Sequence, residues 1–180
     1  MKKRRLAIVA FLLCACMVMG LGYAAMSNKL IANANAHSTQ GELDVYFTAA
    51  AKGENCKEAK LDTTAGKCLS ATMTTDSLTT VGQNSIATFT ITNNESATDN
   101  IVAEIAAATV SNNNSTYFDV SYNFTAGEGT TVAADGQSVT NLPAGKSVTL
   151  TVTVTLKKAV IDTNEVATIS LTYAATAIGN

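Results

Sequence analysis

The sequence predicts an exported all-β protein in which a signal helix precedes an antiparallel β-sandwich. Three observations support this fold class. Apolar and polar residues alternate with a period of two in several segments, clusters of turn-forming residues separate these segments, and no convincing helix lies between them. Strands of this kind have one buried and one solvated face. We therefore expect two sheets packed face to face, as in jelly-roll or immunoglobulin-like domains.

Residues 1–25 have the three parts of a signal peptide. Lysines and arginines occupy positions 2–5, an apolar run covers 6–21, and the small-residue sequence Gly-Tyr-Ala-Ala follows at 22–25. The positive end stays in the cytoplasm while the apolar run enters the translocon, and signal peptidase requires small side chains just before the bond it cuts. We expect cleavage after Ala24 or Ala25, and a chain that is secreted to the extracellular matrix or the cell surface.

Two other fates of this leader remain open. Its apolar stretch approaches the roughly 20 residues that span a bilayer, so an uncleaved anchor is one alternative. A lipid on Cys16 is the other, because the sequence Leu-Cys-Ala-Cys at 13–16 resembles a lipobox. The apolar run continues beyond Cys16, where a lipoprotein turns polar, and this favours cleavage. After cleavage we expect no membrane contact.

Residues 26–40, with the sequence MSNKLIANANAHSTQ, follow the expected cleavage point. Leu30 and Ile31 are the only large aliphatic residues after Met26, and small polar residues surround them. The segment is either a first edge strand or a frayed terminus, or it is a donor strand that pairs with an exposed edge of the next subunit. In the second case Leu30 and Ile31 are the anchoring side chains. A head-to-tail contact that does not close then produces a filament.

From residue 41 onward, alternation predicts the strands of one sandwich domain covering 41–180. Turn-forming residues at 93–94, 111–115, 127–129, 135–136 and 143–145 separate the strands. The residues that share a face in each strand are Leu43, Val45 and Phe47; Ile86, Phe89 and Ile91, with a phase change attributed to a bulge; Ile101, Ala103 and Ile105; Phe118, Val120, Tyr122 and Phe124; Val148, Leu150, Val152, Val154 and Leu156; and Ala167, Ile169, Leu171 and Tyr173.

The region near 52–71 departs from this alternation and carries Cys56 and Cys68, the two cysteines that remain after the leader is removed. An even pair of cysteines in an exported protein predicts a disulfide, and closing a loop of this size contributes about 3 kcal/mol in the chain-entropy model. We expect a disulfide-pinned excursion that stands off the sandwich, with room for one helical turn. Two free thiols remain the alternative. A zinc site is disfavoured because His37 is the only histidine.

Composition excludes several classes of partner. Cleavage removes four of the 12 basic residues and none of the 14 acidic ones, which leaves 8 against 14 and a net charge of −6. An acidic chain without a basic stripe is unsuited to nucleic acid and to anionic membrane surfaces. About 155 mature residues make one domain with a sizeable core.

The residues offer no catalytic, cofactor-binding or metal-binding group that we would assign. A single histidine cannot build a His-Glu-x-x-His zinc site, and neither a Gly-x-Ser-x-Gly elbow nor a supported Cys–His pair is present. The acid pairs Glu42 with Asp44 and Glu95 with Asp99 are better explained as solvent-facing strand and turn residues than as glycosidase carboxylates or calcium ligands. We therefore expect no enzymatic activity and no cofactor.

The start of the chain resembles a known family. The leader ending Gly-Tyr-Ala-Ala at 22–25, Ser-Asn-Lys-Leu-Ile at 27–31 and Gly-Glu-Leu-Asp-Val at 41–45 are similar to the beginning of camelysin- and TasA-like proteins of Gram-positive bacteria. The resemblance implies a SipW-type signal peptidase, an exported jelly-roll sandwich and, as in the best-known members, biofilm fibres formed by donation of an N-terminal strand. It covers roughly the first 47 residues, and the rest matches in pattern only.

This chain also departs from the family. Asn28 stands close to where the family has an aspartate, and the two cysteines are not a family feature. Camelysin is named as a metalloprotease, but this sequence lacks the ligands for that activity, so we do not expect it here.

The expected function is structural. We expect an exported subunit of an extracellular biofilm-matrix fibre or surface layer that assembles by N-terminal donor-strand exchange. The expected partners are further copies of the chain and, during export, signal peptidase; whether an accessory surface protein joins the assembly is left open by the sequence. The alternative is a monomeric secreted adhesin or carbohydrate-binding module. The lack of tryptophan disfavours it, since sugars stack on flat rings and Tyr117, Tyr122 and Tyr173 fall in strands expected to be half-buried.

Overall fold

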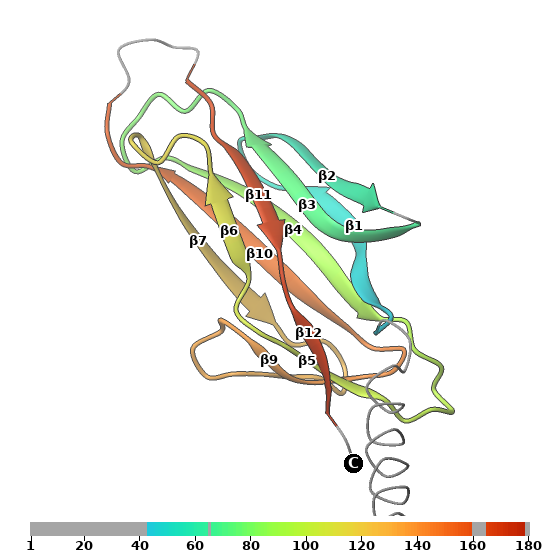
Figure 1. The fold of residues 1–180 in the computed structure, drawn as a ribbon. Helices are drawn as coiled ribbons and strands as arrows, with labels where there is room; N and C mark the ends of the chain where they lie inside the picture. Colours follow the sequence, from blue (N-terminus) through green and yellow to red (C-terminus); the bar gives the residue numbers. More distant parts are fainter. Residues whose placement is uncertain (1–42, 65, 160–164, 179–180) are drawn as a thin grey trace, which may run out of the picture. The chain divides into compact units, whose positions relative to one another are not determined.

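The computed structural model describes residues 43–64, 66–159 and 165–178, which belong to one compact unit, Leu43–Asn180. All regular elements in these residues are β-strands, and they form three antiparallel sheets (Figure 1). The predicted all-β antiparallel class is therefore confirmed, and the arrangement is that of a β-sandwich. The predicted signal peptide 1–25 and assembly segment 26–40 lie outside the described residues.

The first sheet has four strands, in the order β1-β4-β10-β7. These strands are β1 (Val45–Lys52), β4 (Asn84–Asn93), β10 (Ser147–Leu156) and β7 (Phe118–Thr125). In β10 the residues Val148, Leu150, Val152, Val154 and Leu156 are buried, and the intervening Ser and Thr residues lie on the other face, as predicted. Threonine and β-branched valine both suit a pleated, half-buried surface, and this explains the regularity of the strand.

The other two sheets together form the second layer. One has the order β2-β3-β11-β6, with β2 (Cys56–Thr64), β3 (Lys67–Thr75), β11 (Thr168–Thr172) and β6 (Thr109–Asn112). The other has the order β12-β5-β9-β8, with β12 (Ala175–Ile178), β5 (Val102–Ile105), β9 (Val139–Pro143) and β8 (Thr131–Val132).

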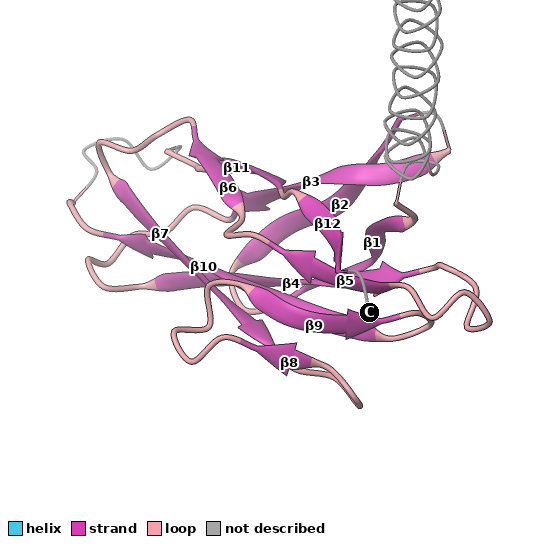
Figure 2. Ribbon diagram, turned by 60° about the horizontal axis from the view of Figure 1, so that its bottom comes forward, coloured by secondary structure: helices cyan, strands magenta, loops and turns pink. Residues whose placement is uncertain are grey.

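The chain itself joins these two sheets. Strand β12 continues β11 after two residues, and β6 continues β5 after three (Figures 1 and 2). Between the two ladders the amide of Ala106 donates to the carbonyl of Ala174 at 3.0 Å. The pair of strands therefore crosses from one sheet into the other with only a short irregularity.

The core lies between the layers and confirms most of the predicted faces. Buried apolar residues come from both layers, and they include Val45, Phe47, Phe89, Ile91, Ala103, Ile105, Phe118, Phe124, Ala167, Ile169 and Leu171 in addition to those of β10. The fully buried Phe118 and Phe124 flank Val120 and Tyr122 on the same face of β7, where the burial is only partial.

The prediction for β4 was partly wrong. Its buried residues are Ser85, Ala87, Phe89, Ile91 and Asn93, in one uninterrupted period of two. Ile86 lies on the opposite face, and β4 pairs with β10 without a shift in register. The bulge lies in the neighbouring strand β1, between Phe47 and Ala49. The error arose because Ile86 is large and Ala87 is small, whereas the site between the sheets accommodates the small residue.

The predicted excursion near 52–71 was also wrong. This region is the hairpin β2–β3, and β3 is an inner strand that pairs with both β2 and β11. Alternation is hard to see in the sequence because β2 carries Lys57, Glu58 and Lys60 on an edge, and because the β2–β3 pairing contains two register shifts. Charged residues and bulges are common devices for protecting edge strands.

Candidate functional site

The residues predicted to act in export and assembly, Ala24, Ala25, Leu30 and Ile31, lie outside the described residues. The described chain enters the sandwich at Leu43 and Asp44. Leu43 is half-buried and packs against the core. Asp44 immediately precedes β1, which is an edge strand of the first sheet.

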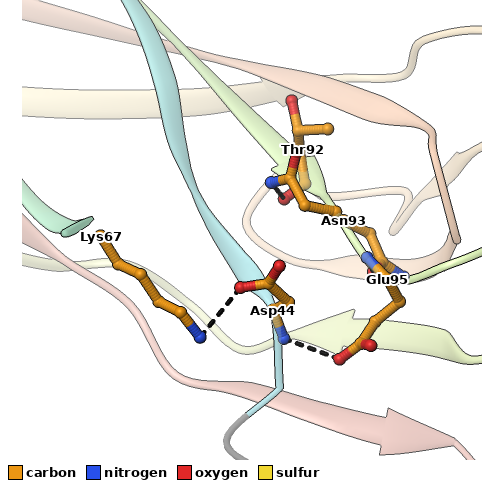
Figure 3. A network of polar contacts seen from close by, with 6 residues as sticks. Asp44, Lys67, Thr92, Asn93 and Glu95 are labelled. Carbon is orange, nitrogen blue, oxygen red and sulfur yellow. Dashed lines mark hydrogen bonds and ion pairs between the residues drawn. The ribbon is translucent and has the colours of Figure 1, made fainter.

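Three residues contact Asp44, and Figure 3 shows the contacts with Lys67 and Glu95. Its carbonyl accepts a hydrogen bond from the amide of Asn94 at 2.7 Å, and its amide donates to Oε1 of Glu95 at 2.8 Å. Its carboxylate forms an ion pair with Nζ of Lys67 at 2.9 Å, where the Lys67 and Asp44 side chains are 30% and 34% exposed. Because partly exposed ion pairs contribute at most about 1 kcal/mol, the two main-chain contacts dominate the positioning.

The position of Glu95 is in turn determined by Asn93, which is fully buried at the end of β4. The amide of Glu95 donates to Oδ1 of Asn93 at 3.1 Å, and Nδ2 of Asn93 donates to the carbonyls of Ile101 and Leu142 at 3.1 and 2.9 Å. A continuous set of hydrogen bonds therefore runs from the loops at this end of the sandwich to Asp44. Asp44 and Glu95 were predicted from sequence only as separate surface acids. Nothing in their spacing indicates the contact.

The predicted disulfide between Cys56 and Cys68 is wrong in this structure, because both cysteines are free. Cys56 pairs with Thr75 at one end of the β2–β3 hairpin, whereas Cys68 lies one residue after Lys67, which pairs with Thr64 at the other end. A rise of about 3.4 Å per residue separates the two ends by roughly 24 Å, and a disulfide requires Cα atoms within about 7 Å. An even cysteine count carries no information about this register.

The two thiols have different surroundings. Cys56 is buried, and its Sγ lies 3.2 Å from the carbonyl of Glu58, which it can donate to. Desolvation raises the pKa of the Cys56 thiol, so that it stays protonated at neutral pH. Cys68 is partly exposed, with its Sγ 3.3 Å from the hydroxyl of Thr63.

Alkylation should therefore distinguish the two cysteines. In the folded chain starting at Met26, iodoacetamide is expected to modify Cys68 first and Cys56 only after unfolding. A reducing agent should leave the thermal midpoint unchanged, since it has no bond to break. Peptide mass spectrometry measures both effects, with Cys68→Ser as the control that removes the folded-state reaction. A linked peptide containing both cysteines would contradict the structure.

The described residues contain no group of three or more His, Cys, Asp or Glu side chains that could hold a metal ion. Across the same residues, no helix is long and apolar enough to cross a membrane.

The outer face of the first sheet is an uncharged surface rich in hydroxyl groups along β4 and β10. Across these strands Thr90 pairs with Thr149, and Thr88 pairs with Thr151. At one end the Thr92 hydroxyl lies 2.8 Å from the Ser147 hydroxyl. The strict alternation of threonine in β10 was visible in the sequence. The alignment of these threonines with those of β4 depends on the register between the two strands, and the sequence does not show it.

Comparison with protein-family models, curated proteins and solved structures finds no match to this chain. The protein is therefore defined by its fold, an antiparallel β-sandwich whose edge strand β1 follows closely after residues 26–40.

Proposed function

We propose that this chain is a secreted structural subunit of an extracellular fibre or surface layer, and that residues 26–40 of each subunit pair with a sheet edge of the next. This is the function implied by the resemblance of the first 47 residues to camelysin- and TasA-like proteins. The observation that carries the proposal is the way the chain enters the sandwich. Only residues 41–42 separate the segment from Leu43 and Asp44, and Asp44 is bonded to Asn94, Glu95 and Lys67.

This arrangement suits a chain segment that connects one subunit to the next and transmits force between them. A strand added to a sheet edge gains affinity from main-chain hydrogen bonds and specificity from its side chains, and Leu30 and Ile31 are the large apolar residues that would anchor it. Since the donor segment and the acceptor edge are different surfaces, the contact is heterologous and propagates as a filament. The short connection to Asp44 then joins each donated strand directly to the body of its own subunit.

Negative-stain electron microscopy tests the proposal. Chains 26–180 and 41–180 are purified and incubated at equal concentrations, beside a variant of 26–180 that carries both Leu30→Ser and Ile31→Ser. The matched control is Ser38→Ala with Thr39→Ala, which leaves the anchoring residues intact. We expect filaments from 26–180 and from the control, and only monomers from the other two. Equal assembly of 26–180 and 41–180 would refute a role for the segment.

A second candidate function, a secreted carbohydrate-binding or adhesive module, draws on the hydroxyl-rich outer face of the first sheet. Tyr46 pairs with Thr92 and so lies beside these hydroxyl groups, where a sugar ring could stack on it. If 26–180 remains monomeric, this function takes precedence. Cosedimentation with insoluble polysaccharide then tests it, with Thr90→Lys and Thr151→Lys expected to abolish binding.

A further inference from the structure

Donor-strand pairing requires an acceptor edge, so the terminal strands of the sheets can be compared. A suitable edge presents main-chain groups that no other residue bonds, lacks charges and bulges, and is not covered by another element. The strands that end the described sheets are β1 and β7, β2 and β6, and β12 and β8. This inference rests on the proposed function, because it identifies the surface that the donated segment binds.

The edge of β7 is closed by side chains and by a loop. The carbonyls of Phe118 and Tyr122 accept hydrogen bonds from Nδ2 of Asn112 and Nε2 of Gln137, both at 2.9 Å. The amide of Phe124 donates to the carbonyl of Gly136 at 2.8 Å. An incoming strand would have to displace all three bonds.

The other edges are protected in different ways. Strand β2 presents the exposed Lys57, Glu58 and Lys60 and contains two register shifts. Strand β1 contains the bulge after Phe47, and the hairpin β2–β3 lies against it. Strand β8 has two residues, and β6 has four and contributes its Asn112 side chain to the β7 edge. Each of these features opposes the addition of a strand.

The edge of β12 has the same length as β6, four residues, but it carries no charge and its pairing with β5 contains no register shift. The bond from Ala106 to the carbonyl of Ala174 directs residue 174 toward β5, so the main-chain groups of Ala175 and Ala177 point away from β5 by the alternation of an antiparallel strand. No group in the described part of the chain bonds them. The strand has the uncharged sequence Ala-Thr-Ala-Ile, and β5 is its main neighbour.

Comparison with β11 shows what is missing beside β12. Strand β11 has β6 on one side and β3 on the other, but its ladder with β3 ends at the pair Thr172 and Ser70. Beyond that pair, β12 has β5 on one side, and the position equivalent to β3 is not filled by any strand of the described residues (Figure 1).

Tyr173, the residue between β11 and β12, supplies an independent observation. Its hydroxyl is buried and has no hydrogen-bond partner among the described residues, while its ring packs edge-to-face on Phe47 with centroids 5.0 Å apart. Burial raises the pKa of this hydroxyl. A buried hydroxyl without a partner is unfavourable, and this one belongs to the residue that lies two positions before the start of β12.

We propose that the open edge of β12, from Tyr173 to Ile178, accepts residues 30–36 of a second copy of this chain as an added strand. These residues have the sequence Leu-Ile-Ala-Asn-Ala-Asn-Ala, in which Leu30, Ala32, Ala34 and Ala36 share one face and Ile31, Asn33 and Asn35 share the other. The period is that of a strand, and the segment is uncharged like the edge that it would bind.

The lengths are also compatible. Seven extended residues span about 23 Å and cover the roughly 20 Å of the six-residue edge. Residues 37–42 then remain to connect the donated strand to Leu43 of its own subunit, over a reach of up to about 20 Å.

A proline at position 177 tests the edge selectively. Ala177→Pro removes an amide that points away from β5, so it should preserve the fold while preventing strand addition. The matched control is Ala59→Pro in β2. The bond from the amide of Thr75 to Ala167 directs the odd residues of β3 toward β11, so the pairing places the Ala59 amide on the outer side of β2. Both are made in chain 26–180.

We expect Ala177→Pro to reduce filament mass in sedimentation at least tenfold with an unchanged circular dichroism spectrum, and Ala59→Pro to assemble normally. Filaments from both variants would overturn the β12 assignment while leaving the proposed function intact. Failure of the unsubstituted chain to assemble would instead overturn the proposed function.

A cross-link identifies the occupant. In a Cys68→Ser background, chains carrying Ala34→Cys are mixed with chains carrying Ala177→Cys, and an oxidant is added. A disulfide between the two different chains supports the proposal. A third chain carries both Ala34→Cys and Ala177→Cys. If a disulfide forms within this chain but not between the two singly substituted chains, the edge accepts the segment of its own subunit, and the assignment to a second copy is overturned.

Discussion

Replacing Asn93 by alanine is expected to lower the free energy of unfolding by about 3 kcal/mol. The side chain is fully buried, donates to the carbonyls of Ile101 and Leu142, and accepts from the amide of Glu95. Alanine supplies none of these partners, so several main-chain groups lose their hydrogen bonds in a region with little access to water. Leaving a buried group unsatisfied costs about 1–3 kcal/mol, which makes the combined loss large.

Urea denaturation of chain 26–180 measures this effect. The neighbouring Asn94→Ala is the control, because the Asn94 side chain is exposed and, among the described residues, donates only to the nearby carbonyl of Thr92. Its main-chain bond to Asp44 is retained in the variant. We expect the control to change stability by no more than about 0.5 kcal/mol. Equal effects of the two substitutions would contradict the role assigned to Asn93.

The class of the fold was accessible from sequence because alternation reports burial directly. Strand β10 is the clearest case, since each of its five apolar residues from Val148 to Leu156 faces the core. The prediction failed in β4, where Ile86 was assigned to the buried face although Ala87 occupies it. The size of the residue that fits between two sheets depends on the facing sheet, and a single strand does not contain that information.

The second layer was harder to predict because its strands depend on distant partners. Strand β3 belongs between β2 and β11, which lies about a hundred residues later in the chain. Register also explains why the predicted disulfide is absent. The even number of cysteines predicted that Cys56 and Cys68 are bonded, but the β2–β3 pairing places them at opposite ends of the hairpin. The contact between Asp44 and Glu95 was also not predictable, because the two residues are 51 positions apart in the sequence. The sequence identified these residues as notable but did not show which of them lie in contact.

The acceptor edge could not have been identified from sequence for a similar reason. A strand pattern such as that of 175–178 does not reveal whether the strand has one neighbour or two. The protection of β7 by Asn112 and Gln137 is likewise a consequence of the tertiary structure. By contrast, the alternation of alanine and asparagine at 32–36 is local, and it is present in the sequence itself.

Replacing Phe47 by alanine is expected to lower the free energy of unfolding by about 4 kcal/mol. Phe47 is 1% exposed, and its ring packs edge-to-face against Phe89 and Tyr173, with centroids 6.0 and 5.0 Å away. Deleting a buried phenylalanine costs about 3–5 kcal/mol, and each aromatic contact adds about 0.5–1.5 kcal/mol to area burial. The control is Tyr46→Ala, on the opposite face of β1, for which we expect a much smaller loss in the same urea titration.

Phe47→Ala also separates two contributions to assembly. Phe47 supports Tyr173, which directly precedes the open edge of β12, so its loss should weaken both the fold and the acceptor edge. Ala177→Pro should weaken assembly alone, because it changes only an outward-facing amide. Measured together, the two variants should give a large loss of stability with a loss of filaments in the first case, and a loss of filaments at nearly unchanged stability in the second. If filaments of Phe47→Ala persist while its stability falls as expected, the edge of β12 does not depend on the packing beneath it.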